Sequence, residues 1–207
     1  AREVPLAGPV FDPRPDPRAQ RVAYVSGATL CVTSLDGTWQ TIAGDAEPDT
    51  VTWGSPDHIA AEEMDRFRGY WWSPDGTRIA ACRVDNAAVT LTYIADPARP
   101  TTAPMEHRYP FAGSANPDVS LHVINLLDGS VVDVEWDRQA FPYLATVGWD
   151  DAGLLLSVQS RDQRNVEVLE VDADTGATTV RLADTDACWV ELVPGTPRRW
   201  GNDQLVT

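Results

Sequence analysis

The sequence predicts an all-β fold, and three observations support this prediction. Short runs of apolar, often β-branched residues alternate with polar ones at the period of two that is typical of half-buried strands. Asp-Gly pairs, which supply the positive φ angles of tight hairpin turns, stand between these runs. Sixteen prolines and 14 glycines in 207 residues indicate many loops and few helices.

The predicted strands and turns follow one another along the chain. The clearest alternation is found in Arg21–Val25, Thr29–Thr33, Val89–Ile94, Val119–Leu126 and Val166–Val171. Turn signals stand at Asp36-Gly37, Asp75-Gly76, Asp128-Gly129 and Asp174-Thr175-Gly176. Only the segment around residues 60–69 has a helical period, so we expect one short helix near residues 61–68.

A weak internal repeat refines the fold class. Its best copy is Trp72–Ala80, with the sequence W-S-P-D-G-T-R-I-A, and degenerate copies begin at Asp16, Trp149 and Trp200. Each copy has a turn followed by a strand. Repeats of about 40–50 residues with four strands each are typical of propeller blades. We therefore predict an incomplete β-propeller of about four blades, with an insertion between Trp72 and Trp149 and with Trp72 in a blade core.

Composition excludes several classes of function. The net charge is −15, from 31 acidic and 16 basic residues, which argues against binding to nucleic acid or to an anionic membrane. No apolar run approaches the 18 residues or so of a membrane-spanning helix. The three cysteines form no C-x-x-C pair and are expected to be free, buried thiols. The three histidines lack metal-ligand spacing, so neither a metal nor another cofactor is expected.

The ends of the chain carry weaker signals. The chain begins at Ala1 without an initiator Met and stops at Thr207 inside a predicted strand, so we expect a piece of a longer protein. No basic-then-apolar leader is visible, which favours a cytoplasmic location.

Residues 59–76 carry the most chemical information. Two adjacent carboxylates, Glu62 and Glu63, precede a basic and aromatic run that ends in Trp71-Trp72. Adjacent residues do not share a helix face, but the two carboxylates could converge on one cation at a helix start or a bend. A primary ammonium, with three donors and a full charge, suits such a pair. By itself, however, an acidic pair is most often solvated surface.

Two stretches of the sequence resemble the dipeptidyl peptidase IV family of serine peptidases, of the prolyl oligopeptidase type. Residues 62–74, E-E-M-D-R-F-R-G-Y-W-W-S-P, are similar to the double-glutamate segment of its cytosolic and bacterial branch. Residues 106–117 resemble its R-Y-P-x-A-G-x-x-N-P stretch. Residues 143–149, 160–165 and 186–190 fit the blades that follow, so the resemblance covers almost the whole chain in order.

The resemblance implies a fold and a function. In the family, an N-terminal eight-bladed propeller covers a C-terminal α/β-hydrolase domain. Paired glutamates, matched here by Glu62 and Glu63, bind the free N-terminal amine of a peptide. The hydrolase domain then releases an X-Pro or X-Ala dipeptide with a Ser-His-Asp triad. No G-x-S-x-G motif is found, so residues 1–207 would be a partial propeller domain, with no catalytic residue and the hydrolase domain absent from this chain.

The expected partners follow from the same resemblance. They are a peptide with a free N-terminus and the hydrolase domain of the same polypeptide, but no nucleic acid and no membrane. A homodimer is left open, since family members often dimerise through the hydrolase domain and a propeller arm.

Alternatives remain for the function and for single residues. The chain could belong to a non-enzymatic propeller that serves as a protein-binding platform, or to an inactive relative. Asp65 and Arg66 could support the site, or they could form an exposed pair without effect. Arg108-Tyr109-Pro110 is interpreted as a turn at a blade edge.

Overall fold

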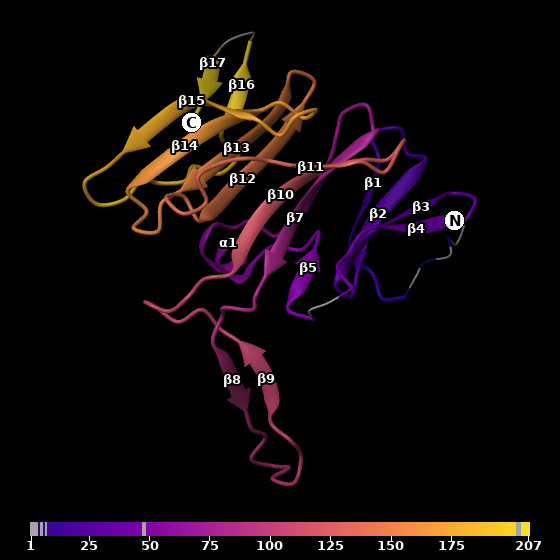
Figure 1. The fold of residues 1–207 in the computed structure, drawn as a ribbon, viewed down its shortest axis with the longest axis vertical. Helices are drawn as coiled ribbons and strands as arrows, with labels where there is room; N and C mark the ends of the chain where they lie inside the picture. Colours follow the sequence, from indigo (N-terminus) through magenta and orange to yellow (C-terminus); the bar gives the residue numbers. More distant parts are fainter. Residues whose placement is uncertain (1–3, 5, 7, 47–48, 202–203) are drawn as a thin grey trace.

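Three antiparallel sheets stand side by side in the computed structural model, which describes residues 4, 6, 8–46, 49–201 and 204–207 (Figure 1). Two hairpins and one short helix complete the described chain. This confirms the predicted all-β class and is consistent with a partial propeller. Among the described residues, no helix is both long enough and apolar enough to cross a membrane.

The first sheet is a four-stranded meander, and we call it blade 1. Its strands lie in the order β1-β2-β3-β4. They are β1 (Phe11–Pro15), β2 (Arg21–Ser26), β3 (Thr29–Ser34) and β4 (Trp39–Ala43). The two strands predicted in this region are therefore confirmed. The Asp36-Gly37 turn joins β3 to β4, with Gly37 at a φ of 93°, a conformation that favours glycine.

The second sheet, blade 2, contains a split strand. Its order is β11-β10-β7-β5, and β6 pairs with β7 as well. The strands are β5 (Val51–Trp53), β6 (Tyr70–Trp72), β7 (Arg78–Asp85), β10 (Asp118–Asn125) and β11 (Val131–Asp133). Between β7 and β10 the chain forms the projecting hairpin of β8 (Leu91–Ile94) and β9 (Met105–Arg108), which accounts for the predicted insertion (Figure 1).

The third sheet, blade 3, is again a meander, in the order β12-β13-β14-β15. Its strands are β12 (Tyr143–Asp150), β13 (Gly153–Gln159), β14 (Asn165–Val171) and β15 (Thr178–Thr185). A separate hairpin follows, made of β16 (Arg198–Trp200) and β17 (Gln204–Val206). The predicted count of about four blades thus corresponds to three blades and one further hairpin.

Apolar side chains fill the spaces between neighbouring blades. Alternate residues of β7 point to opposite faces, as the strand period requires. Ile79 and Ala81 pack with Leu30 and Trp72 towards blade 1, whereas Cys82 packs with Leu121, Leu144 and Leu156 towards blade 3. Trp72 is 8% exposed, which confirms its predicted place in a blade core. The expectation of three buried thiols is wrong for Cys188, which is exposed in a loop, whereas Cys31 and Cys82 are buried and free.

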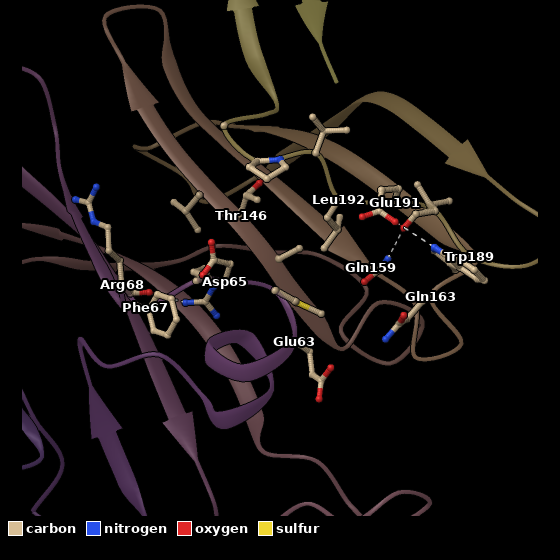
Figure 2. A pocket seen from close by; sticks show the side chains of 18 of the residues that line it. Glu63, Asp65, Phe67, Arg68, Thr146, Gln159, Gln163, Trp189, Glu191 and Leu192 are labelled. Carbon is tan, nitrogen blue, oxygen red and sulfur yellow. Dashed lines mark hydrogen bonds between the residues drawn. The ribbon is translucent and has the colours of Figure 1, made fainter.

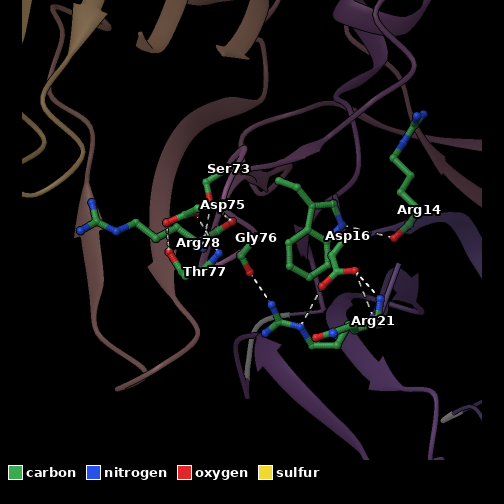
Figure 3. Close-up of polar contacts among 10 residues, drawn as sticks. Arg14, Asp16, Arg21, Ser73, Asp75, Gly76, Thr77 and Arg78 are labelled. Carbon is green, nitrogen blue, oxygen red and sulfur yellow. Dashed lines mark hydrogen bonds and ion pairs between the residues drawn. The ribbon is translucent and has the colours of Figure 1, made fainter. Parts of the chain in front are cut away.

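Arginines connect the turns of neighbouring blades, and Figure 3 shows the contact between Arg21 and the Gly76 carbonyl. The Arg21 guanidinium pairs with the buried Asp16 carboxylate at 3.2 Å and donates to the Gly76 carbonyl in blade 2. Arg78 of blade 2 pairs in turn with Asp174 of blade 3. Turn residues of the repeat therefore have partners outside their own blade.

The position predicted for the helix is wrong by several residues. The helix α1 (His58–Glu63) begins after Asp57, whose carboxylate accepts a hydrogen bond from the Ala60 amide at 3.0 Å as an N-cap. Asp65 has a φ of 53°, a left-handed conformation that a helix cannot continue through. Residues 65–69 therefore run on in irregular conformation instead of forming the second half of the predicted helix 61–68.

Candidate functional site

The candidate site is built on an interruption of one strand. The strands β5 and β6 pair with the same strand, β7, in one continuous register, with Trp53 opposite Arg83 and Tyr70 opposite Ala81. Between them, the Gly54 amide donates to the Cys82 carbonyl at 2.9 Å, and the Cys82 amide donates to the Gly69 carbonyl at 2.8 Å. Gly54 thus supplies the amide, and Gly69 the carbonyl, that a single strand residue opposite Cys82 would supply. Residues 55–68 leave the sheet between these two glycines, and we call this segment the excursion.

The base of this 55–68 excursion is tightly closed. A Cβ atom at Gly69 would overlap the backbone of Gly54 and Ser55, so only glycine fits at this close approach. The incoming and outgoing chains therefore touch where they meet the blade. The helix α1, which carries Glu62 and Glu63, lies within the excursion.

Arg66 holds the excursion from inside. It is 7% exposed and pairs with Asp57 at 3.0 Å, and both of these side chains are buried. Its Nε donates to the Leu144 carbonyl of β12 at 3.1 Å, and its Nη1 donates to the Arg68 carbonyl at 2.7 Å. Nη1 also lies 3.7 Å from Cys82 Sγ. The alternative of an idle surface pair with Asp65 is therefore wrong, because Arg66 is buried and pairs with Asp57.

A cavity of about 580 Å³ opens between the excursion and blade 3 (Figure 2). One wall is formed by residues 63–68 and Trp71, and the other by parts of blade 3 and by the 189–195 loop. This loop is tied to blade 3 because Gln159 Nε2 donates to the Val190 carbonyl and the Val190 amide donates to the Gln163 carbonyl. The volume lies within the range of sites that bind small ligands.

The two predicted site residues lie differently with respect to this cavity. Both side chains are exposed at the C-terminal end of α1, not at a helix start. Glu63 lines the cavity at its rim, whereas Glu62 is not among the lining residues (Figure 2). Successive residues of a helix point in different directions, which accounts for the different positions of these two side chains relative to the cavity.

Other charged groups surround the same space. Asp65 and Glu191 line the cavity together with Arg68, which is half-buried against the Trp71 ring. Burial lowers the pKa of the Arg68 guanidinium, and the nearby Arg14 acts in the same direction. Glu191 accepts a hydrogen bond from the Trp189 indole at 3.2 Å. The lining thus combines three carboxylates with the half-buried Arg68 guanidinium, since Arg66 is engaged by its own partners.

Tyr109 has a contact that its sequence context did not indicate. Its ring packs edge-on against His58, the first residue of α1, with centroids 5.1 Å apart, and against Phe111 at 4.9 Å. The interpretation of Arg108-Tyr109-Pro110 as a blade-edge turn is wrong, because Arg108 ends β9 of the projecting hairpin and Tyr109 and Pro110 follow it outside any turn. Tyr109 instead contacts the helix of the excursion.

A Ser-His-Asp contact occurs elsewhere, on blade 2. Ser120 Oγ lies 2.8 Å from His122 Nε2, and His122 Nδ1 lies 2.6 Å from Asp133 Oδ1. Burial lowers the pKa of His122, although Asp133 opposes this effect. None of the three residues lines the cavity described above, so the contact does not form part of the candidate site. Among the described residues, no three or more His, Cys, Asp or Glu side chains gather so that they could hold a metal ion.

Several residues of the site were missed at the level of sequence. Asp57 follows a Pro and precedes an apolar helical run, which is an ordinary helix-start signal and could have revealed its capping role. Arg66 and the Leu144 carbonyl lie 78 positions apart in the sequence, and no local pattern connects them. The same holds for Gln159 and Gln163.

Comparisons with known proteins agree with this architecture. The family model described as "Dipeptidyl peptidase IV (DPP IV) N-terminal region" matches residues 3–204. A probable dipeptidyl peptidase 4 from Emericella nidulans is 31% identical over 177 residues, which cover 79% of this chain and 22% of that protein. Dipeptidyl peptidase 8 from Homo sapiens is 27% identical over 128 residues, or 52% of this chain and 14% of that protein.

Solved structures share the fold. The crystal structure of Porphyromonas gingivalis dipeptidyl peptidase 4 matches with a TM-score of 0.78 and 23% identity, over 89% of this chain and 27% of that one. A putative dipeptidyl aminopeptidase IV from Bacteroides ovatus gives the same TM-score at 24% identity, over 90% of this chain and 26% of that one. The chain thus spans between 14% and 27% of the length of these four proteins.

Proposed function

The chain belongs to the dipeptidyl peptidase IV N-terminal region family, and from this premise we propose that it selects substrates for a serine exopeptidase of that kind. In this proposal, Glu62 and Glu63 bind the free N-terminal amine of a peptide. An α/β-hydrolase domain elsewhere in the same polypeptide then releases an X-Pro or X-Ala dipeptide. The contribution of the described chain is recognition, and bond chemistry takes place in the other domain.

One observation carries the proposal. Glu63 lies at the rim of a cavity of about 580 Å³, next to Glu62 and at the C-terminal end of α1. The excursion that carries this helix is closed at its base by Gly69 and fixed by Arg66. A carboxylate on a fixed support beside a space of this size suits the capture of a small cationic group. Carboxylates near the C-terminal end of a helix also lie at the negative end of its dipole, which favours a cation there.

The chemistry of the amine fits the pair. A peptide ammonium has three N–H donors and a full positive charge, and each carboxylate offers two acceptor oxygens. Charge-assisted hydrogen bonds of this kind are about twice as strong as neutral ones. Acetylation removes both the charge and two of the donors, so an N-blocked peptide would lose most of the interaction. A net charge of −15 would further attract cationic amino termini.

Holding the amine would also set the length of the released product. With the N-terminus fixed, the scissile carbonyl would lie at a constant distance from Glu62 and Glu63. Fixing a reacting group in this way supplies proximity and orientation to a nucleophile on the other domain.

The test uses the full-length protein that contains this chain. We expect strong cleavage of Gly-Pro 4-nitroanilide with a free amine and almost none of the N-acetylated compound. Glu62→Gln and Glu63→Gln should each weaken this preference. Equal cleavage of both compounds, or wild-type activity in both variants, would refute amine recognition by the pair. Absence of any cleavage would favour the binding platform or the inactive relative.

A further inference from the structure

The helix that carries Glu62 and Glu63 cannot position itself. It spans only His58–Glu63, far shorter than the 12–15 residues or so that an isolated helix needs in water. Of its six residues only Ala60 is buried, so little apolar surface anchors it to β12. The position of the two carboxylates must therefore come from contacts that surrounding residues make.

Arg66 supplies contacts to four separate parts of the site. Its Nη2 pairs with Asp57, which caps the N-terminus of α1, and its Nη1 bonds to the Arg68 carbonyl on the returning chain. Nη1 also contacts Cys82 Sγ in β7, and Nε bonds to the Leu144 carbonyl in blade 3. In addition, the Arg66 amide donates to the Ala60 carbonyl at 2.9 Å, which joins the same residue to the body of the helix.

From these contacts we infer that Arg66 is the positioning residue for Glu62 and Glu63. It fixes α1 relative to blades 2 and 3 at once, and thereby sets the distance from the carboxylates to the opposite wall of the cavity. This inference rests on the proposed function, because positioning matters only if the pair binds an amine. Arg66 acts through the helix and need not touch the substrate.

The geometry of the guanidinium explains why arginine is needed here. Its planar fork directs five donors to fixed places, and three of its nitrogens are used towards four acceptors. A lysine ammonium could keep the pair with Asp57 but could not also reach the Leu144 carbonyl on the far side. Arg66→Lys therefore keeps the buried charge balanced while it removes the link to blade 3.

The experiment compares kcat/KM for Gly-Pro 4-nitroanilide with kcat/KM for its N-acetylated form, in the full-length protein. A misplacement of about 1 Å can lower a rate a hundredfold, so Arg66→Lys should reduce the preference for the free amine about 100-fold. Asp57→Asn is a second, milder test, because asparagine still caps a helix but no longer carries the charge that Arg66 needs. We expect a loss in the same direction.

Arg21→Lys is the matched control. Arg21 also pairs with a buried carboxylate, Asp16, and also reaches a carbonyl of another blade, at Gly76, but it does not line the cavity. It should lower the melting temperature and leave the preference for the free amine unchanged. If Arg66→Lys lowered only the melting temperature, as Arg21→Lys does, Arg66 would be structural and the inference would be wrong.

Combining variants separates the two proposals. If Arg66 acts through the carboxylates, adding Arg66→Lys to Glu62→Gln and Glu63→Gln should cause little further loss on the free-amine substrate. A full additional 100-fold loss would refute positioning. If the glutamate variants retain the preference, the proposed function itself fails. If they lose it while Arg66→Lys and Asp57→Asn retain it, only the positioning inference fails.

Discussion

Glu63 and Glu62 should contribute unequally to amine recognition. Glu63 lines the cavity and Glu62 does not, although both are exposed at the end of α1. A direct hydrogen bond to a charged partner contributes about 1.5–3 kcal/mol, so Glu63→Gln should lower kcat/KM on a free-amine dipeptide amide about 10- to 150-fold. Glu62 would act through space in nearly aqueous surroundings, where a unit charge at about 4 Å is worth roughly 1 kcal/mol, or about 5-fold.

The assay for this asymmetry measures kcat/KM for both variants at low and at high salt. Screening should shrink the effect of Glu62→Gln more than that of Glu63→Gln, because Debye screening acts most strongly on exposed, indirect pairs. Glu135→Gln, which changes an exposed carboxylate that follows β11 and lies outside the cavity lining, controls for net charge. A loss for Glu62→Gln that equals or exceeds the loss for Glu63→Gln would refute the argument from the cavity rim.

Three further predictions concern the fold. Deleting residues 55–69 joins Gly54 to Tyr70, which lie opposite Cys82 and Ala81. The blade should therefore still fold, as measured by circular dichroism and thermal melting, but the enzyme should show no preference for free amines. Failure to fold would contradict the continuous register. Burial raises the pKa of Asp16, but hydrogen bonds from Gln20 and Arg21 outweigh this and bring it below 3.8. The ionised Asp16 carboxylate therefore stabilises the folded protein above about pH 4, and this stabilisation is lost as the pH falls further. The difference in melting temperature between wild type and Asp16→Asn should accordingly shrink in acid. A difference that stays constant with pH would exclude the ionised carboxylate as its source. Leu156→Ala, in the core, should cost about 2–5 kcal/mol in denaturant unfolding, against less than about 0.5 kcal/mol for the exposed Leu127→Ala; similar costs would mean that Leu156 is not a core residue.

Most of the fold could be predicted because its signals are local. Alternation in segments such as Arg21–Val25 reports one buried face of a strand, and Asp-Gly pairs report the turns between strands. The repeat located a blade core because each copy has a turn followed by a strand, and Trp72 opens the best copy. The helix was misplaced because the Asp57 cap was overlooked and because the left-handed Asp65 has no signature of its own.

The site was predictable only where it is continuous in sequence. Glu62 and Glu63 form one visible motif, but whether each faces a cavity depends on the direction of a short helix. The residues that set this direction lie apart: Asp57 and Arg66 are nine positions apart, and Leu144 lies 78 positions beyond Arg66. Cys188 shows the same limit, since a small apolar residue beside a strand pattern was expected to be buried and instead lies exposed in a loop.

The candidate site is formed by two blades, so its shape depends on how these blades pack against each other. The excursion leaves blade 2, whereas the opposite wall of the cavity and the Leu144 carbonyl belong to blade 3. Besides Arg66, side chains packed between the blades influence the distance between the walls, among them Cys82, Leu121, Leu144 and Leu156. Close-packed interiors transmit changes in volume, so a core substitution between these blades would move one wall relative to the other. Amine recognition should therefore depend on the packing between blades 2 and 3 as much as on the glutamates themselves, whereas packing between blades 1 and 2 should affect stability alone.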